Sequence, residues 1–112
     1  MPVLVIREKA TKDEIQEMLK SLETYIKVAV DISQGVLAGG GTLDADCESL
    51  LIQEGNRQED IWGADWFPET KEIRYEAMIN IAPKRKNRSM EIQDPAVREK
   101  VKIVIQNLLD LQ

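Results

Sequence analysis

The sequence predicts an α+β fold: a mainly antiparallel β-meander of about five strands, with two helices packed on one face of the sheet. Three observations indicate this class. Residues 26–32 and 73–81 alternate apolar with polar side chains, a period of two that is typical of half-buried strands. Residues 11–22 and 94–111 instead carry apolar side chains at helical spacing. The length of 112 residues, 43% of them hydrophobic, suits one α+β domain over residues 1–112.

The first half of the chain supplies a helix and a hairpin. Residues 3–6 are a short apolar run, which predicts a strand. Thr11 and Glu14 then have the spacing of a capping box, so we expect the first helix to begin at Thr11. Residues 26–32 predict a second strand, and a short turn returns the chain along residues 36–38.

Residues 44–54 fit two structures. Cys47 and Leu51 have helical spacing, and Gly55 is a suitable residue to end such a helix. The apolar run at residues 50–52, followed by Gly55, also fits a strand that pairs with the next segment. We favour the strand, because strands are expected on both sides of this stretch.

Residues 58–82 predict a long β-hairpin. This stretch contains both tryptophans and the only phenylalanine of the chain. Its second half, from Ile73 to Ile81, alternates cleanly, and Pro68 presets the backbone of a turn between the two halves. We expect the apolar face of this hairpin to form the floor of the core.

The last predicted helix begins at Asp94, which suits the N-cap, and Pro95, which suits the first turn. Six residues form one apolar stripe along it, namely Val97, Val101, Val104, Ile105, Leu108 and Leu111. Ile103 projects from nearly the opposite side and has no evident role in a monomer. We therefore predict that Ile103 lies at an interface.

Charge is divided along the chain, and this division predicts self-association. Within a net charge of −5, residues 31–76 carry eleven acidic and three basic side chains, whereas residues 84–102 carry seven basic and three acidic ones. In a homodimer, the acidic sheet of each copy can face the basic segment of the other. Nucleic acid is not the expected partner, because the chain is acidic overall. The leading hypothesis is a non-enzymatic protein-interaction or self-associating domain, with a homodimer expected and an unknown protein partner as a further option.

Composition argues against several classes of function. Histidine is absent, which removes the residue most used for proton transfer near neutral pH and the commonest metal ligand. Cys47 is the only cysteine, so no internal disulfide can form and a reducing compartment is expected. No apolar run approaches the ~20 residues that span a bilayer. We expect a cytoplasmic protein without a cofactor and without membrane association, and no catalytic residue can be named.

An acidic cluster supplies the alternative hypothesis. If residues 44–54 form a strand, Asp44, Asp46 and Glu48 project from one face of it, and Asp60 can join them. Magnesium and calcium prefer such oxygen ligands. The alternative function is therefore a metal-dependent hydrolase or nuclease that uses this Asp/Glu cluster, with Mg²⁺ or Ca²⁺ as the cofactor.

The basic run at residues 84–88 has two interpretations. Arg85 and Arg88 are its candidate anion-binding residues, and together with an exposed aromatic ring the run can bind single-stranded nucleic acid. The run also fits a solvated loop or a partner for the acidic sheet, which is the interpretation we favour.

Four segments give the chain a resemblance to a known family. They are DISQGVLAGGG from residue 31, ADCESLL from residue 45, NRQEDIWGADW from residue 56 and NRSMEIQD from residue 87. They resemble segments of a small bacterial family of single-domain proteins with no assigned function, and the similarity covers the chain from residue 25 onward. The resemblance implies a stand-alone cytoplasmic bacterial protein, and it implies no activity, cofactor or catalytic residue.

Overall fold

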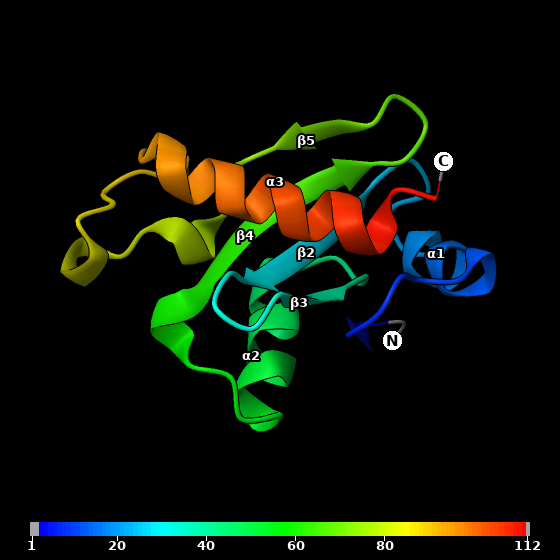
Figure 1. The fold of residues 1–112 in the computed structure, drawn as a ribbon, viewed down its shortest axis with the longest axis horizontal. Coiled ribbons are helices and arrows are strands. Elements are labelled where there is room, and N and C mark those ends of the chain that lie inside the picture. Colours follow the sequence, from blue (N-terminus) through cyan, green and yellow to red (C-terminus); the bar gives the residue numbers. More distant parts are fainter. Residues whose placement is uncertain (1–2, 112) are drawn as a thin grey trace.

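A computed structural model describes residues 3–111, and its centre is one antiparallel sheet with the strand order β1-β3-β2-β4-β5 (Figure 1). The strands are Leu4–Ile6 (β1), Ile26–Asp31 (β2), Val36–Gly39 (β3), Ile61–Phe67 (β4) and Glu72–Arg74 (β5). The helices are Lys12–Leu19 (α1), Asp44–Gln53 (α2) and Pro95–Leu109 (α3). The α+β class and the five antiparallel strands are thus confirmed. The strand order differs from that of a simple meander, because β1 pairs with β3 and α2 carries the chain past β2 to β4.

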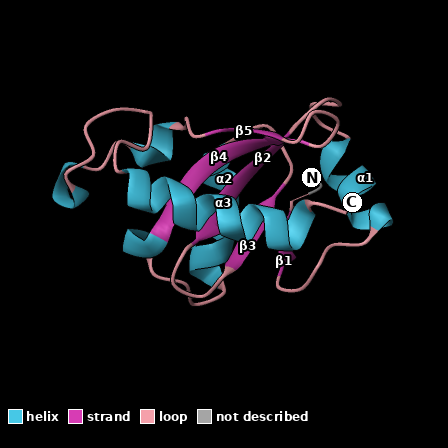
Figure 2. Ribbon diagram, turned by 45° about the horizontal axis from the view of Figure 1, so that its top comes forward, coloured by secondary structure: helices cyan, strands magenta, loops and turns pink. Residues whose placement is uncertain are grey.

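The predicted arrangement of the helices is wrong in two respects. Within the described residues there are three α-helices rather than two, and they do not share one face of the sheet (Figures 1 and 2). α3 and α1 pack on one face, here called the α3 face, and α2 packs on the opposite α2 face. The sheet is therefore covered on both sides, which explains why almost every residue of β2 and β4 is buried.

The favoured strand at residues 44–54 is also wrong, because these residues form α2. Cys47 and Leu51, one helical turn apart, are fully buried against the sheet. Leu43 precedes the helix and provides no side-chain cap, so the sequence lacks a clear helix start here. Gly55 follows the helix with a φ of +98°, the left-handed backbone that commonly ends a helix.

The hairpin at residues 58–82 is shorter than predicted. β4 and β5 pair with Trp66 opposite Ile73, but β5 ends at Arg74. The chain then turns onto the α2 face, where Asn80 hydrogen-bonds to the backbone of Gly63 in β4. Only the first part of the alternating pattern of residues 73–81 is therefore a strand: Ile73 and Tyr75 pack against the core beneath α3, Ile79 packs against the core beneath α2, and Ile81 is exposed.

Strand β4 shows how the two faces differ. Trp62, Ala64 and Trp66 point to the α3 face, while Ile61, Gly63 and Asp65 point the other way. The α3 face holds the larger core, which includes Val28, Val30 and Trp66 from the sheet and Val101, Val104, Ile105 and Leu108 from α3. The α2 face holds a smaller core of Ala29, Val36, Ala38, Cys47, Leu51 and Ile61.

The predicted helix starts are confirmed. Thr11 and Glu14 form a reciprocal capping box at α1, and the Asp94 carboxylate accepts a hydrogen bond from the Ala96 amide at α3. α3 ends at Leu109, so Leu111 lies beyond the helix and is exposed.

Candidate functional site

A cleft on the α2 face gathers charged and apolar side chains from five segments of the chain. It lies between the first turn of α2 and residues 76–79, and its volume is about 340 Å³. Its charged residues are Lys27 of β2, Asp44 of α2, Asp65 of β4 and Glu76. Leu43, Met78 and Met90 line it as well and are among the exposed large apolar residues of the surface. We call this site the α2-face cleft.

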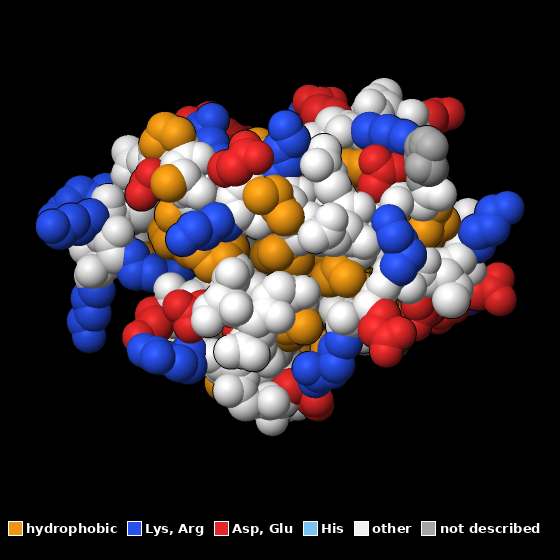
Figure 3. All heavy atoms as spheres, viewed as in Figure 1, with side chains coloured by type: hydrophobic (Ala, Val, Ile, Leu, Met, Phe, Trp, Pro, Cys, Tyr) orange, Lys and Arg blue, Asp and Glu red, His pale blue; other side chains and the backbone are white. Residues whose placement is uncertain are grey.

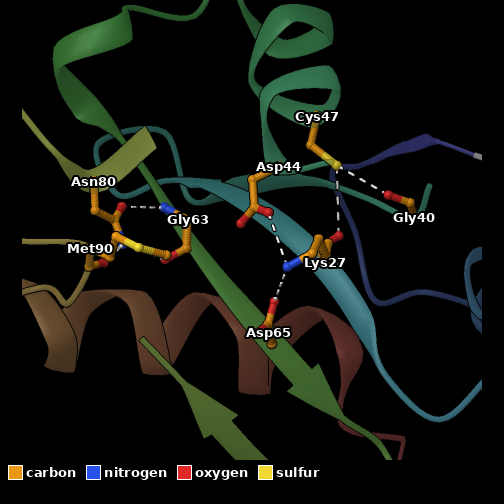
Figure 4. Close-up of polar contacts among 8 residues, drawn as sticks. All are labelled: Lys27, Gly40, Asp44, Cys47, Gly63, Asp65, Asn80 and Met90. Carbon is orange, nitrogen blue, oxygen red and sulfur yellow. Dashed lines mark hydrogen bonds and ion pairs between the residues drawn. The ribbon is translucent and has the colours of Figure 1, made fainter. Parts of the chain in front are cut away.

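Lys27 bridges two carboxylates at the base of the cleft. It stands opposite Asp65 in the register between β2 and β4, and the helix α2 begins with Asp44 directly beside them. The Lys27 Nζ atom lies 3.3 Å from Asp44 Oδ1 and 3.3 Å from Asp65 Oδ1 (Figure 4). Lys27 and Asp65 are neighbours only because two strands pair, and Asp44 joins them only because residues 44–53 are helical.

Burial and charge pull the pKa values of this cluster in opposite directions. Burial alone lowers the pKa of Lys27, but the charges and hydrogen bonds of Asp44 and Asp65 outweigh it and raise the pKa above its ordinary value. Lys27 therefore stays protonated at neutral pH and is no nucleophile. Burial raises the pKa values of Asp44 and Asp65, and the nearby Lys27 charge only partly offsets this effect.

One oxygen of Asp44 is left without a partner. Asp44 is 8% exposed, and its Oδ2 atom is buried with no hydrogen-bond donor among the described residues. Figure 4 shows this oxygen turned away from Lys27, toward the side of the cleft where Gly63 and Asn80 lie. Leaving a buried acceptor unpaired costs about 1–3 kcal/mol, so this atom marks a place where a donor would be stabilising.

Gly63 permits the close approach of the cleft walls. A Cβ atom at this position would lie 2.5 Å from Ala77 Cβ and 3.0 Å from Asp44 Oδ2. Any larger residue would therefore push residues 77–79 or the Asp44 carboxylate away from the sheet. The absence of a side chain at Gly63 allows both cleft walls to reach β4.

Two buried asparagines hold the wall at residues 77–93, which contains almost no regular structure. Asn80 donates from Nδ2 to the carbonyls of Gly63 and Met90, and its Oδ1 accepts from the Gly63 amide at 2.8 Å. Asn87 Nδ2 lies 2.9 Å from the carbonyl oxygens of Asn80, Ser89 and Glu91. These side-chain amides add to the backbone hydrogen bonds that join residues 75–77 to residues 90–92, and together the two sets fix the position of the cleft rim.

The structure does not assemble the predicted metal ligands. Asp44 lies in the cleft, but Asp46 and Glu48 point elsewhere on α2, and Glu48 accepts a hydrogen bond from Gln58 instead. Asp60 sits in a separate 3₁₀ turn before β4. Successive helical residues rotate by about 100°, so a spacing of two no longer gives a common face. No group of three or more potential ligands lies together among residues 3–111.

Of the other predicted site residues, Arg85 contacts other parts of the chain, whereas Arg88 and Ile103 are exposed. The Arg85 guanidinium lies 3.9 Å from the centre of the Trp62 ring and donates to the carbonyls of Glu59, Ile61 and Ile79. Arg88 is exposed, and Ile103 is 47% exposed on the outer side of α3. Anion binding at Arg85 and Arg88, and an interface at Ile103, stay predictions.

Cys47 is confirmed as a buried residue. Its thiol lies 3.4 Å from the carbonyl oxygen of Gly40, and burial followed by the charges of Asp44 and Asp46 raises its pKa to about 12. A thiol with such a pKa is protonated at neutral pH and is a poor nucleophile.

Sequence reasoning missed Lys27 as a site residue. A signal was present: Lys27 is the one basic residue in the otherwise apolar run of residues 26–30. Such a residue needs a partner when its strand is covered on both faces. The identity of that partner depends on the register of β2 against β4, which a single sequence does not reveal.

A model of a family of proteins of unknown function, DUF5674, matches residues 4–108. The chain belongs to this family. The predicted membership in a family without an assigned function is therefore confirmed, while a bacterial origin stays a prediction. No curated protein and no solved structure matches the chain. The DUF5674 match covers every strand and all three helices except the last residue of α3, so the α2-face cleft lies within the family region. In the described part of the chain, no helix is long and apolar enough to cross a membrane.

Proposed function

We propose that this DUF5674 protein is a non-enzymatic interaction domain that self-associates. In the dimer, the α2-face cleft of one copy takes the basic loop of the other, where the basic loop means residues 84–88. The observation that carries this proposal is that an acidic cleft lies beside a basic loop in which Lys84, Lys86 and Arg88 form no ion pair within residues 3–111. A cytoplasmic location and the absence of catalysis belong to the same proposal.

The cleft carries an excess of negative charge. Its three carboxylates, from Asp44, Asp65 and Glu76, face one ammonium group, that of Lys27. Because Lys27 is already shared between two of the carboxylates, Glu76 and the free oxygen of Asp44 remain for a further cationic group. The exposed apolar side chains of Leu43, Met78 and Met90 lie next to these charges, and exposed apolar surface of this kind is available for a partner to cover.

The basic loop has the complementary charge and the right position. Lys84, Lys86 and Arg88 are exposed, and within residues 3–111 none of them forms an ion pair. The loop projects from one end of the molecule, where Figure 3 shows Lys and Arg side chains gathered (Figures 1 and 3). It follows the cleft wall at Ile79 closely and ends two residues before Met90 of the rim.

In a two-fold symmetric dimer, both clefts and both basic loops can be used at the same time. In an isologous pair, residue i of one copy meets residue j of the other and the reverse contact also forms. Since cleft and loop are neighbours, an axis between them can place each loop at the other copy's cleft. Ile103 lies on α3, across the sheet from the cleft, so one such contact cannot also bury Ile103.

Light scattering and sedimentation across a range of concentrations test the dimer. The wild-type chain should show a mass near twice 12.7 kDa. Glu76→Lys and Lys86→Glu should each weaken the dimer roughly tenfold or more, about 1.4 kcal/mol, while the double variant should recover part of the loss. Lys100→Glu, which makes the same charge change on the exposed side of α3, should have no effect.

Two outcomes contradict the proposal. A wild-type chain that stays monomeric at high micromolar concentration removes self-association altogether. A dimer that dissociates with Ile103→Glu but not with Lys86→Glu places the interface on α3 and not at the cleft.

A further inference from the structure

We infer that the α2-face cleft is also a binding site for a small organic cation, namely an alkyl chain that ends in an ammonium or guanidinium head group. This site goes beyond self-association, because a free ligand occupies it in a monomer. The inference rests on the unpaired Asp44 oxygen, the charge of the cleft, and the apolar side chains at its edge.

The Asp44 Oδ2 atom defines the position of the head group. It is a buried carboxylate oxygen without a donor among the described residues, on a side chain that is 8% exposed and lines the cleft. Because the other oxygen already meets Lys27, Oδ2 can accept a hydrogen bond without any change in the existing ion pairs (Figure 4). An N–H group on a cation is the strongest type of donor for such an oxygen.

The charge of the cleft selects an organic cation over an anion or a bare metal ion. Asp44, Asp65 and Glu76 repel an anion, and only Lys27 opposes them. A metal ion between Asp44 and Asp65 would have to displace the Lys27 ammonium, which lies 3.3 Å from both carboxylates. A head group at Asp44 Oδ2 instead binds on the side away from Lys27 and keeps that ammonium in place.

The edge of the cleft suits an alkyl chain. Leu43, Met78 and Met90 are 56%, 73% and 45% exposed, so their apolar surface has little covering within the chain. Met78 lines the same cleft as Asp44, and its unbranched thioether side chain can adapt to the shape of a ligand. A volume of about 340 Å³ lies at the small end of the range for ligand pockets, which limits the ligand to a short chain.

Titrations followed by backbone amide NMR test the site with three probes that share a butyl chain and one positive charge. Butylguanidinium and butylammonium carry N–H donors, whereas butyltrimethylammonium carries none. Both the wild-type chain and the Lys86→Glu variant are titrated. The two donors should produce saturable shifts confined to residues 42–45, 63–65 and 76–79, and butyltrimethylammonium should bind at least tenfold more weakly.

Variants identify the oxygen that binds the head group. Asp44→Asn should raise the Kd of butylguanidinium at least tenfold, because it replaces part of the acceptor and removes the charge. Asp46→Asn on the same helix, outside the cleft, should leave the Kd within twofold. Glu76→Gln, at an exposed position, should raise the Kd severalfold and provides the test if Asp44→Asn does not fold.

The inference is overturned if the three cations bind alike, if their shifts lie outside the cleft, or if neither Asp44→Asn nor Glu76→Gln changes the Kd. These results are independent of the dimer, which is measured by mass. A monomeric wild-type chain that still binds butylguanidinium at Asp44 supports the cation site and removes only the proposed self-association.

Discussion

The two faces of the sheet are built from different kinds of residue, although the same strands supply both. On β4, Trp62 and Trp66 point to the α3 face, whereas Gly63 and Asp65 point to the α2 face. On β2, Val28 points to the first of these faces and Lys27 to the second. The alternation of a single strand thus separates large apolar side chains from small and charged ones.

This difference indicates that stability and binding are assigned to opposite faces. Large buried side chains under α3 remove most apolar surface from water, which is the main favourable term in folding. Small residues on the α2 face let α2 and residues 77–80 come close to the sheet, and this proximity brings Asp44 next to Lys27 and Asp65. Substitutions on the two faces should therefore have different consequences.

Trp66→Ala should produce the largest loss of stability, about 3–5 kcal/mol, because it leaves a cavity in the α3-face core. Trp66 is 1% exposed. Phe67→Ala is the matched control on the same strand: Phe67 is half-buried and stacks on Tyr25 at the end of the sheet, so its loss should cost less. Urea unfolding measures both. Equal costs for the two variants would contradict the assignment of stability to the α3 face.

Gly63→Ala should cost about 1–3 kcal/mol, because the added methyl group overpacks the α2 face. Its nearest neighbour would be Ala77 Cβ at 2.5 Å. The double variant Gly63→Ala/Ala77→Gly moves one methyl group across the contact and should recover much of the loss. Urea unfolding of the single and double variants measures this. A Gly63→Ala variant as stable as wild type would show that the cleft walls are not held tightly against β4.

The charged cluster should make a smaller, pH-dependent contribution. The pKa values of Asp44 and Asp65 are raised, mainly by burial, so the native chain binds protons more tightly than the unfolded chain. These two groups therefore favour folding more as the pH falls from neutral toward 4. The free energy of unfolding of the wild-type chain minus that of Asp65→Asn should increase over this interval, and a constant or falling difference would contradict the raised pKa values.

Lys27 provides the opposite end of the same pH profile. Its pKa is raised above the ordinary 10.5, so the stability that its ion pairs contribute is fully present below pH 10.5. That contribution is lost only as the pH rises through the higher pKa of the folded state. Chemical unfolding of the wild-type chain and of Lys27→Met at alkaline pH measures this contribution. The free energy of unfolding of the wild-type chain minus that of Lys27→Met should stay level up to pH 10.5 and fall above it.

Ile103→Ala should have the smallest effect, within about 0.5 kcal/mol, because exposed positions contribute little to folding. Ile105, two residues along α3, is fully buried, and its replacement by alanine should cost about 2–5 kcal/mol. Thermal unfolding of the two variants at low protein concentration compares them directly. A large loss for Ile103→Ala would mean that this side chain is covered by a partner.

Signals that lie within one element were read correctly from the sequence. The capping box at Thr11, the N-cap at Asp94 and the alternation of residues 26–32 each depend on neighbours a few positions away. Both helix starts are confirmed, and a strand forms over Ile26–Asp31. The strand prediction for residues 44–54 was wrong because Leu43 gives no cap and because contacts with the sheet stabilise the helix. Local propensity could not decide between helix and strand here.

The candidate site depended on contacts between distant segments, so the sequence predicted it only in part. The sequence indicated Asp44 as a candidate site residue, but as part of a metal-binding cluster with Asp46 and Glu48. These three side chains share a face on a strand and do not share one on a helix. The actual neighbours of Asp44 are Lys27 and Asp65, which require the register of β2 against β4. In the wall at residues 77–93, side-chain amides hydrogen-bond to backbone groups. Periodicity in the sequence does not predict such hydrogen bonds.

Because α3 is the last element of the chain, the α3 face of the sheet can be covered only at the end of translation. Ribosomes deliver a chain from its N-terminus, so Trp62 and Trp66 emerge well before Pro95–Leu109, the helix that covers them. The α2 face can close as soon as residues 77–93 are available, but the α3 face has to wait. Until α3 is made, the nascent chain exposes the more apolar face of its sheet to solvent, and exposed apolar surface of this kind is what chaperones bind.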